Sequence, residues 1–128
     1  MMHITTALTT HTSNGTETIT QTFQGTLQQQ GGLTLLTYDD PELGATRLFV
    51  HPDRVRLVRK GAFTTQMVFL PNATTHNDYH SPGGVFDLAI HTTHFNLSPT
   101  LPDRHLELHY TLSINGEEVA QNQLTITF

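Results

Sequence analysis

Apolar and polar residues alternate along most of this chain, and turn-forming residues interrupt the alternation at short and nearly even intervals. The alternation is clearest over residues 105–115, where Leu, Tyr or Ile occupies every second position from Leu106 to Ile114. Successive side chains of a β-strand point to opposite faces, so this period predicts strands with one buried face. No segment shows a helical period of useful length. We therefore expect an all-β protein.

Turn signals divide the chain into about nine or ten expected strands. Asn14-Gly15 and Asn115-Gly116 are typical of tight hairpins, and Pro52-Asp53 is typical of a type I turn. The apolar pattern of residues 85–98 changes its parity near Thr92–His94, which indicates a β-bulge. The expected strands span residues 3–12, 17–30, 33–39, 45–51, 55–60, 62–70, 75–80, 85–98, 105–115 and 119–128.

The length of the chain and its last strand indicate how the strands are joined. A chain of 128 residues suits one domain with one core. Residues 119–128 carry no charge and would form a sticky free edge unless another strand covers them. Pairing them with residues 3–12 would close the sheet. We therefore predict a single domain over residues 1–128, folded as a closed antiparallel meander barrel of about 8–10 strands.

Charge and composition exclude several functions. Only 13% of the residues are charged and the formal net charge is −5 with His neutral, so nucleic acid is not an expected partner. The chain has no Cys, hence no disulfides or thiol chemistry, which fits a reducing cytoplasm. We see neither a secretory signal nor an apolar run long enough to span a membrane, and expect a cytoplasmic protein without membrane contacts. Protonating all nine His would move the net charge from −5 to +4, so the surface potential should respond to pH between roughly 5 and 7.

Hairpin register predicts a polar row on the inner face of three consecutive strands. The loop at residues 40–44 and the turn at residues 52–53 are short enough to fix which residues lie opposite one another. The pairing that aligns the apolar residues places Tyr38 opposite Thr46 and Thr46 opposite Arg59. Tyr38, Thr46 and Arg59 should therefore form one inward cross-strand row.

An arginine on an inner face has two interpretations. In the structural one, Arg59 lies near a barrel end, its stem packs, and its head bonds to Tyr38, a turn carbonyl or an acid within residues 39–42. A buried charge must be paired, because desolvating it alone costs several kcal/mol. In the functional one, Arg59 binds the carboxylate or phosphate of a ligand inside the barrel with its bidentate fork. Small closed barrels either hold one ligand or fill with side chains.

Several short motifs occur in a characteristic order along nearly the whole chain. They are Tyr38-Asp39-Asp40, residues 55–61 with Arg59 and Gly61, Phe69, Tyr79, Pro82-Gly83-Gly84 and Leu124-Thr125-Ile126. In this order and spacing, over roughly residues 3–128, the chain resembles the YwiB-like family of uncharacterised bacterial proteins.

The resemblance implies a calycin-like or lipocalin-like antiparallel barrel in the cytoplasm. The family has no assigned biochemical function, so it implies no catalytic residues. The matching positions include Tyr38, Arg59 and Tyr79, together with Gly61 and Gly84. The chain departs from the family in one respect, because two adjacent acids, at positions 39 and 40, compete for the place after the Tyr. The partner of Arg59 therefore stays open.

Histidines near the end of the chain raise the question of a metal. His105, Glu107 and His109 share one strand face, where neighbours two apart are about 6.8 Å apart and the two His are about 13 Å apart. His91 and His94 on the preceding strand could approach them. Zinc needs three or four converging ligands. The simpler interpretation is a solvent-facing polar surface, and we expect no metal.

No sequence motif points to catalysis. The chain lacks a G-x-S-x-G elbow, a P-loop and a dinucleotide-binding fingerprint. We therefore expect no catalytic residues and no cofactor.

Three hypotheses about function remain open. In the first, a non-enzymatic barrel binds a small apolar or anionic ligand in its interior, through Arg59, Tyr38, Thr46 and Tyr79. In the second, a filled barrel acts as a protein-interaction module or homodimer through its outer face. In the third, the His face serves a metalloenzyme.

Overall fold

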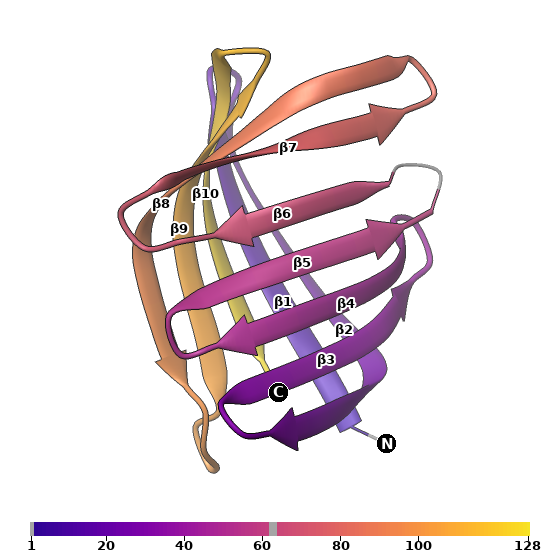
Figure 1. Ribbon diagram of the computed structural model, residues 1–128, viewed down its shortest axis with the longest axis vertical. Helices are drawn as coiled ribbons and strands as arrows, with labels where there is room; N and C mark the ends of the chain where they lie inside the picture. Colours follow the sequence, from indigo (N-terminus) through magenta and orange to yellow (C-terminus); the bar gives the residue numbers. More distant parts are fainter. Residues whose placement is uncertain (1, 62–63) are drawn as a thin grey trace.

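The computed structural model describes residues 2–61 and 64–128, which form ten antiparallel strands in one barrel (Figure 1). Strands β3 to β6 cross the front of the barrel at a steep angle to β8, β9 and β10 behind them. No helix within the described residues has the length and apolarity needed to cross a bilayer. The strands are β1 (Met2–Thr12), β2 (Gly15–Gln30), β3 (Leu33–Asp40), β4 (Gly44–His51), β5 (Arg54–Lys60), β6 (Thr65–Phe69), β7 (Thr74–Ser81), β8 (Gly84–Ser98), β9 (His105–Ile114) and β10 (Glu117–Thr127).

The predicted all-β fold is confirmed, and most strand limits fall within two residues of those expected from the alternation. The main difference is β6, expected over residues 62–70 and found over Thr65–Phe69. Residues 62 and 63 of that expected strand lie outside the described part of the chain. The bulge expected near Thr92–His94 is present, as a shift in the β8–β9 register between these two residues.

Each strand pairs with its neighbour in sequence except at one place. The sheet order is β6-β5-β4-β3-β2-β1-β10-β9-β8-β7. The first and last strands pair from Thr5 opposite Thr127 to His11 opposite Gln121, as the uncharged last strand predicts. This ladder protects the apolar strand β10 from becoming a free edge.

The barrel is nearly closed, and its seam lies between β6 and β7, which are the two ends of the sheet. An isolated backbone bridge joins Thr64, which directly precedes β6, to His80 of β7 through hydrogen bonds of 3.1 and 3.2 Å. In addition, the Thr75 hydroxyl donates to the Val68 carbonyl. The alternation of residues had not indicated this seam.

The turn between β6 and β7 explains why these strands do not form a full ladder. Asn72 N–H donates to the Thr92 carbonyl at 2.9 Å, and Thr92 N–H donates to the Ala73 carbonyl at 3.2 Å. Asn72 also takes a left-handed backbone conformation with φ of 60°. The bulge in β8 begins at Thr92, so the turn is tied to β8 instead of continuing the β6–β7 pairing.

The hydrophobic core lies between the front and back strands. Each fully buried aliphatic or aromatic side chain contributes about 1.5–3 kcal/mol by leaving water. Phe23 of β2 stacks on Tyr38 of the neighbouring strand β3 with centroids 4.7 Å apart. Phe69 of β6 meets Tyr110 of β9 edge-on at 4.9 Å, a contact between strands that do not pair. The largest fully buried apolar side chains are Phe69, Ile4, Leu36, Leu48, Ile90, Leu106, Leu108, Ile126, Val50 and Val55.

Candidate ligand-binding site

The predicted inward row of Tyr38, Thr46 and Arg59 is confirmed by the register of three strands. Tyr38 of β3 lies opposite Thr46 of β4, which lies opposite Arg59 of β5. Tyr38 and Thr46 are buried, whereas Arg59 is half-buried. The row therefore introduces a cation and two hydroxyls among core side chains.

Hydroxyl groups bind the Arg59 side chain. Its Nε donates to the Thr46 hydroxyl at 3.4 Å, and the guanidinium also hydrogen-bonds to the Tyr38 side chain. Across residues 2–61 and 64–128, Arg59 forms no ion pair with a carboxylate. The hydrogen-bond partners of the Arg59 guanidinium are thus uncharged hydroxyl oxygens. A guanidinium has five N–H donors, so further donors are available to a ligand.

The acid nearest to the row in sequence has another role. Asp40 is buried, and its Oδ1 accepts from the N–H groups of Glu42 and Leu43 at 2.8 and 3.1 Å. Asp39, by contrast, is exposed. Asp40 is therefore the inward member of the acid pair, and it stabilises the β3–β4 loop without forming an ion pair with Arg59.

Two buried tyrosines stay protonated in this environment. Burial raises the pKa of Tyr38 above its usual 10.0, and Asp40 adds to the rise, while Arg59 opposes it by its charge and its hydrogen bond. Burial also raises the pKa of Tyr110, against the lowering effects of a hydrogen bond from Asn122 and the charge of Arg59. Both phenol groups are neutral at ordinary pH and can donate hydrogen bonds.

Two hollows, both partly open to solvent, border Arg59 on the inner face of the sheet. The first has a volume of about 170 Å³ and includes Leu8, Phe23, Tyr38, Asp40, Glu42 and Leu124 in its lining. The second, of about 230 Å³, is lined mainly by apolar side chains, among them Met67, Tyr79, Leu88, Leu112 and Ile114. Leu43 and Arg59 line both hollows, so these two side chains stand between them.

The structure places the four predicted site residues differently with respect to the hollows. Arg59 borders both, Tyr38 lines the first and Tyr79 lines the second. Thr46 is fully buried and lines neither, so its contact with the site runs through Arg59 Nε. Sequence reasoning did not identify Leu43 as a site residue. Leu43 is an apolar residue in an otherwise polar loop, and this departure from the loop's polarity was the signal that could have identified it.

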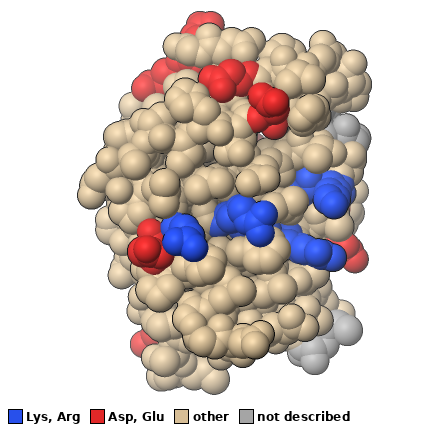
Figure 2. Space-filling view, viewed as in Figure 1, with Lys and Arg blue, Asp and Glu red and all other residues tan. Residues whose placement is uncertain are grey.

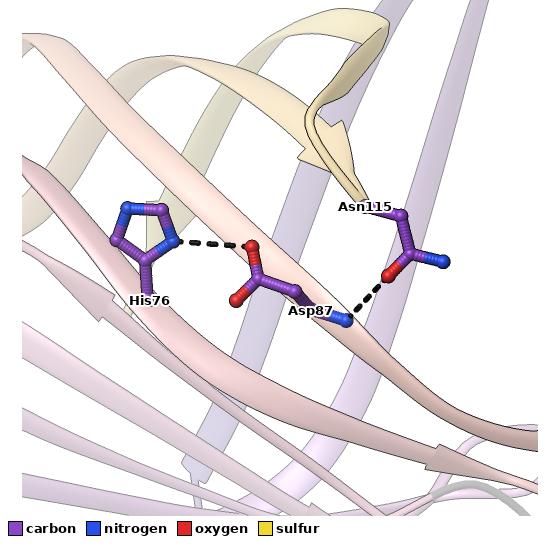
Figure 3. Close-up of polar contacts among 3 residues, drawn as sticks. All are labelled: His76, Asp87 and Asn115. Carbon is purple, nitrogen blue, oxygen red and sulfur yellow. Dashed lines mark hydrogen bonds and ion pairs between the residues drawn. The ribbon is translucent and has the colours of Figure 1, made fainter.

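The outer face carries two further groups of polar side chains. His76 Nδ1 lies 3.2 Å from Asp87 Oδ2, and the Asp87 N–H donates to Asn115 Oδ1 at 2.9 Å (Figure 3). These contacts tie β7, β8 and the β9–β10 hairpin together. The second group, around His94 on β8 and β9, includes residues that the sequence had led us to treat as solvent-facing.

The fold and the site define a class: a small, nearly closed antiparallel barrel with an inward arginine beside interior hollows, consistent with a calycin-like barrel. A family model described as a domain of unknown function (DUF1934) matches residues 2–126, and the chain belongs to this family.

Comparison of folds confirms the resemblance to YwiB. The crystal structure of the ywiB protein from Bacillus subtilis matches with a TM-score of 0.85 and 20% identity, over 98% of this chain and 87% of that one. Among curated proteins, none matches the sequence significantly. At this identity the likeness establishes the fold alone.

Proposed function

We propose that this protein is a non-enzymatic barrel that binds a small molecule with an apolar body and an anionic end. The observation that carries the proposal is Arg59, a half-buried cation that borders both interior hollows without an acidic partner in the described chain. Withdrawing a cation from water is costly unless an anion or several acceptors compensate it. A ligand carboxylate would supply that compensation through a bidentate contact.

We also propose the cytoplasm as the compartment, as the family resemblance implies.

The volumes restrict the ligand to a small one. Pockets that hold drug-sized ligands usually exceed about 300 Å³, whereas the hollows measure about 170 and 230 Å³. A short- or medium-chain carboxylate is the simplest molecule that combines this size with an anionic end.

Charge favours one orientation of such a ligand. The first hollow contains the carboxyl groups of Asp40 and Glu42, which would repel an anion. The second contains apolar side chains from β6, β8 and β9, and no acid is among its described lining residues. We therefore place the carboxylate at Arg59 and the apolar tail in the second hollow, while the neutral Tyr38 hydroxyl would hold the guanidinium from the side of the first hollow. Thr46 would orient the guanidinium through Nε, and Tyr79 would contact the tail.

Thermal-shift and native mass spectrometry measurements with octanoate test this proposal. Octanoate should raise the melting temperature of the native protein and of Arg56→Leu, which removes a cation from the outer face of the same strand. It should not raise that of Arg59→Leu. 1-Octanol, which lacks the charge, should raise the melting temperatures of the native protein and of Arg56→Leu by less than octanoate does. The proposal fails if neither octanoate nor its shorter and longer straight-chain homologues bind, or if Arg59→Leu binds octanoate normally.

Filling each hollow separately tests the orientation. Leu112→Trp should fill the second hollow and abolish octanoate binding, whereas Leu8→Trp should fill the first and leave binding largely intact. The reverse result would place the tail in the first hollow.

A basic band on the outer face favours a second candidate, an interaction module. Figure 2 shows Lys and Arg gathered across the face formed by β4 and β5. Arg47, Arg56 and Lys60 line a shallow groove there with Phe49, whose ring lies 4.2 Å below the Arg56 guanidinium. Because the chain as a whole has a net charge of −5, the band is complementary to acidic surfaces, including those of a second copy.

Sedimentation velocity at low and high salt distinguishes this candidate. A dimer held by the band should form at low ionic strength, dissociate as salt screens the charges, and be absent in Arg47→Ser/Arg56→Ser. A monomer under all conditions would argue against self-association through this face.

A further inference from the structure

Three side chains on the outer face of β8 and β9 converge in the manner of metal ligands. His94 Nε2 lies 3.2 Å from Glu107 Oε1, and His109 Nε2 lies 3.9 Å from Glu107 Oε2. The two imidazole rings are tilted against each other with centroids 4.5 Å apart. One ligand atom from each residue lies within 4.8 Å of the other two.

The bulge in β8 brings these side chains together. His94 lies opposite His109, and Thr92 lies opposite Tyr110, so Thr93 is the extra residue on β8. Without the bulge, His94 would lie opposite the inward-facing Leu108 and would point into the barrel. The Thr93 hydroxyl donates to the His109 carbonyl at 3.3 Å, which stabilises the bulge beside the ligands.

The geometry points to a binding site for a divalent transition metal ion, and we propose that His94, Glu107 and His109 bind Zn²⁺ through two imidazoles and one carboxylate. These are ordinary zinc ligands, at about 2.0–2.2 Å from the metal, which places ligand atoms of a tetrahedral site about 3.4 Å apart. The ligand atoms of His94, Glu107 and His109 lie within 4.8 Å of one another, so their separations exceed the tetrahedral distance by about 1.4 Å at most. Small rotations of these partly exposed side chains close the difference, and water takes the fourth position.

Two neighbouring histidines have other partners and serve as controls. His105 Nδ1 donates to the Asp103 carbonyl at 2.9 Å, which turns this ring toward the β8–β9 loop. His91 Nδ1 hydrogen-bonds to the Thr74 hydroxyl at 2.8 Å, on the β7 side of β8. Neither belongs to the group of three, although His105 shares a strand and a face with it.

Calorimetric titration of the tag-free protein with ZnCl₂ tests the site. We expect one Zn²⁺ per chain, and no comparable binding of Mg²⁺, which prefers oxygen ligands. His94→Ala, Glu107→Gln and His109→Ala should each weaken the affinity by about tenfold or more. His105→Ala and His91→Ala should change the zinc affinity by no more than about twofold. Losing even a group that only supports a ligand typically costs about tenfold or more, so the two outcomes are distinguishable.

Nuclear magnetic resonance of the histidine ring nitrogens provides an independent measurement. Zinc should shift the ring signals of His94 and His109 and leave those of His91 and His105 unchanged. The site is refuted if Zn²⁺ does not bind, if the three ligand substitutions leave the affinity intact, or if the control substitutions weaken it equally. In any of these cases the His–Glu contacts are a surface ion-pair group without a metal.

Discussion

At the scale of single residues, the interior is organised by groups that are polar but mostly neutral. The hydroxyl groups of Tyr38 and Thr46 surround the Arg59 side chain, and Asp40 is occupied by the amides of its own loop. Because burial keeps the phenol of Tyr38 protonated, the site contains hydrogen-bond donors and the Arg59 cation. Within the described residues no acid forms an ion pair with this cation, so an anionic ligand would complement the positive charge.

Stability at alkaline pH should depend on the two buried tyrosines. Their pKa values are raised above 10.0 in the fold, chiefly by burial, so above this pH the unfolded chain loses its phenol protons first. The free energy of unfolding should be unaffected below pH 10 and fall above it, by up to about 1.4 kcal/mol per pH unit for each group. Urea unfolding between pH 8 and 11.5 should show this decline, and Tyr38→Phe/Tyr110→Phe should flatten it. Equal slopes in both proteins would contradict the role of these groups.

Gly25 should tolerate no side chain. It lies opposite Tyr38, and an added Cβ would overlap the Thr37 carbonyl oxygen and lie 2.6 Å from Ile4 Cδ1. Gly25→Ala should therefore lower the free energy of unfolding by about 1–3 kcal/mol. Gly32→Ala is the matched control, because its Cβ would meet only Pro52 at 3.6 Å, and it should be nearly neutral in urea unfolding. Similar losses in both variants would contradict the packing argument.

At the scale of elements, the strands are joined by ordinary ladders and by a few side chains that replace missing backbone pairs. The Thr75 hydroxyl bonds to Val68 across the β6–β7 seam, and Asn115 performs a similar function at the end of β9. Asn115 Oδ1 accepts from the Asp87 N–H at 2.9 Å (Figure 3). The backbone N–H of Asn115 donates to the Asp87 carbonyl, also at 2.9 Å. The side chain thereby adds a rung beyond the β8–β9 ladder.

Substitutions of Asn115 should separate this hydrogen bond from backbone strain. Asn115 has φ of 51°, a conformation that glycine adopts freely. Asn115→Gly loses the contact with Asp87 alone and should cost about 1 kcal/mol. Asn115→Ala loses the same contact and adds about 1–2 kcal/mol for the left-handed backbone. Urea midpoints should therefore rank native above Gly above Ala, and an Ala variant as stable as the Gly variant would exclude the strain.

At the scale of the whole molecule, the barrel depends on the pairing of its two chain ends more than on its seam. The β1–β10 ladder covers an apolar strand whose Leu124 and Ile126 side chains belong to the core. At the seam, by contrast, the described residues form one backbone bridge, between Thr64 beside β6 and His80 of β7. Removing β10 would expose two edges and part of the core at once. Opening the chain at the seam would expose edges that are already nearly unpaired.

Two rearranged chains test this difference. A circular permutant that begins at Asn72, with a short flexible linker between the original ends, should fold, because Thr5 and Thr127 already lie opposite each other. A chain truncated after Ile114 lacks β10 and should show no cooperative thermal transition by circular dichroism. If the truncated chain folds, or if the permutant lacks the circular dichroism spectrum of the native protein, the β1–β10 ladder is not more important for the fold than the β6–β7 seam.

The sequence by itself determined the strands, their order and the Tyr38–Thr46–Arg59 row. The period of two assigns each side chain to a face, and short turns allow little choice of register, so these features depend on residues close together in the chain. For the same reason the bulge at Thr92–His94 was visible as a change of parity.

Only the tertiary structure decided what meets across the barrel. Whether Arg59 faces an acid or a hollow depends on side chains from β1, β6, β8 and β9, which no single strand pattern relates to one another. The β6–β7 seam depends on the turn at Asn72 finding Thr92, and the His94–His109 contact depends on where β8 pairs after its bulge. Alternation within a strand is local, whereas cavities and convergent side chains result from packing between distant strands.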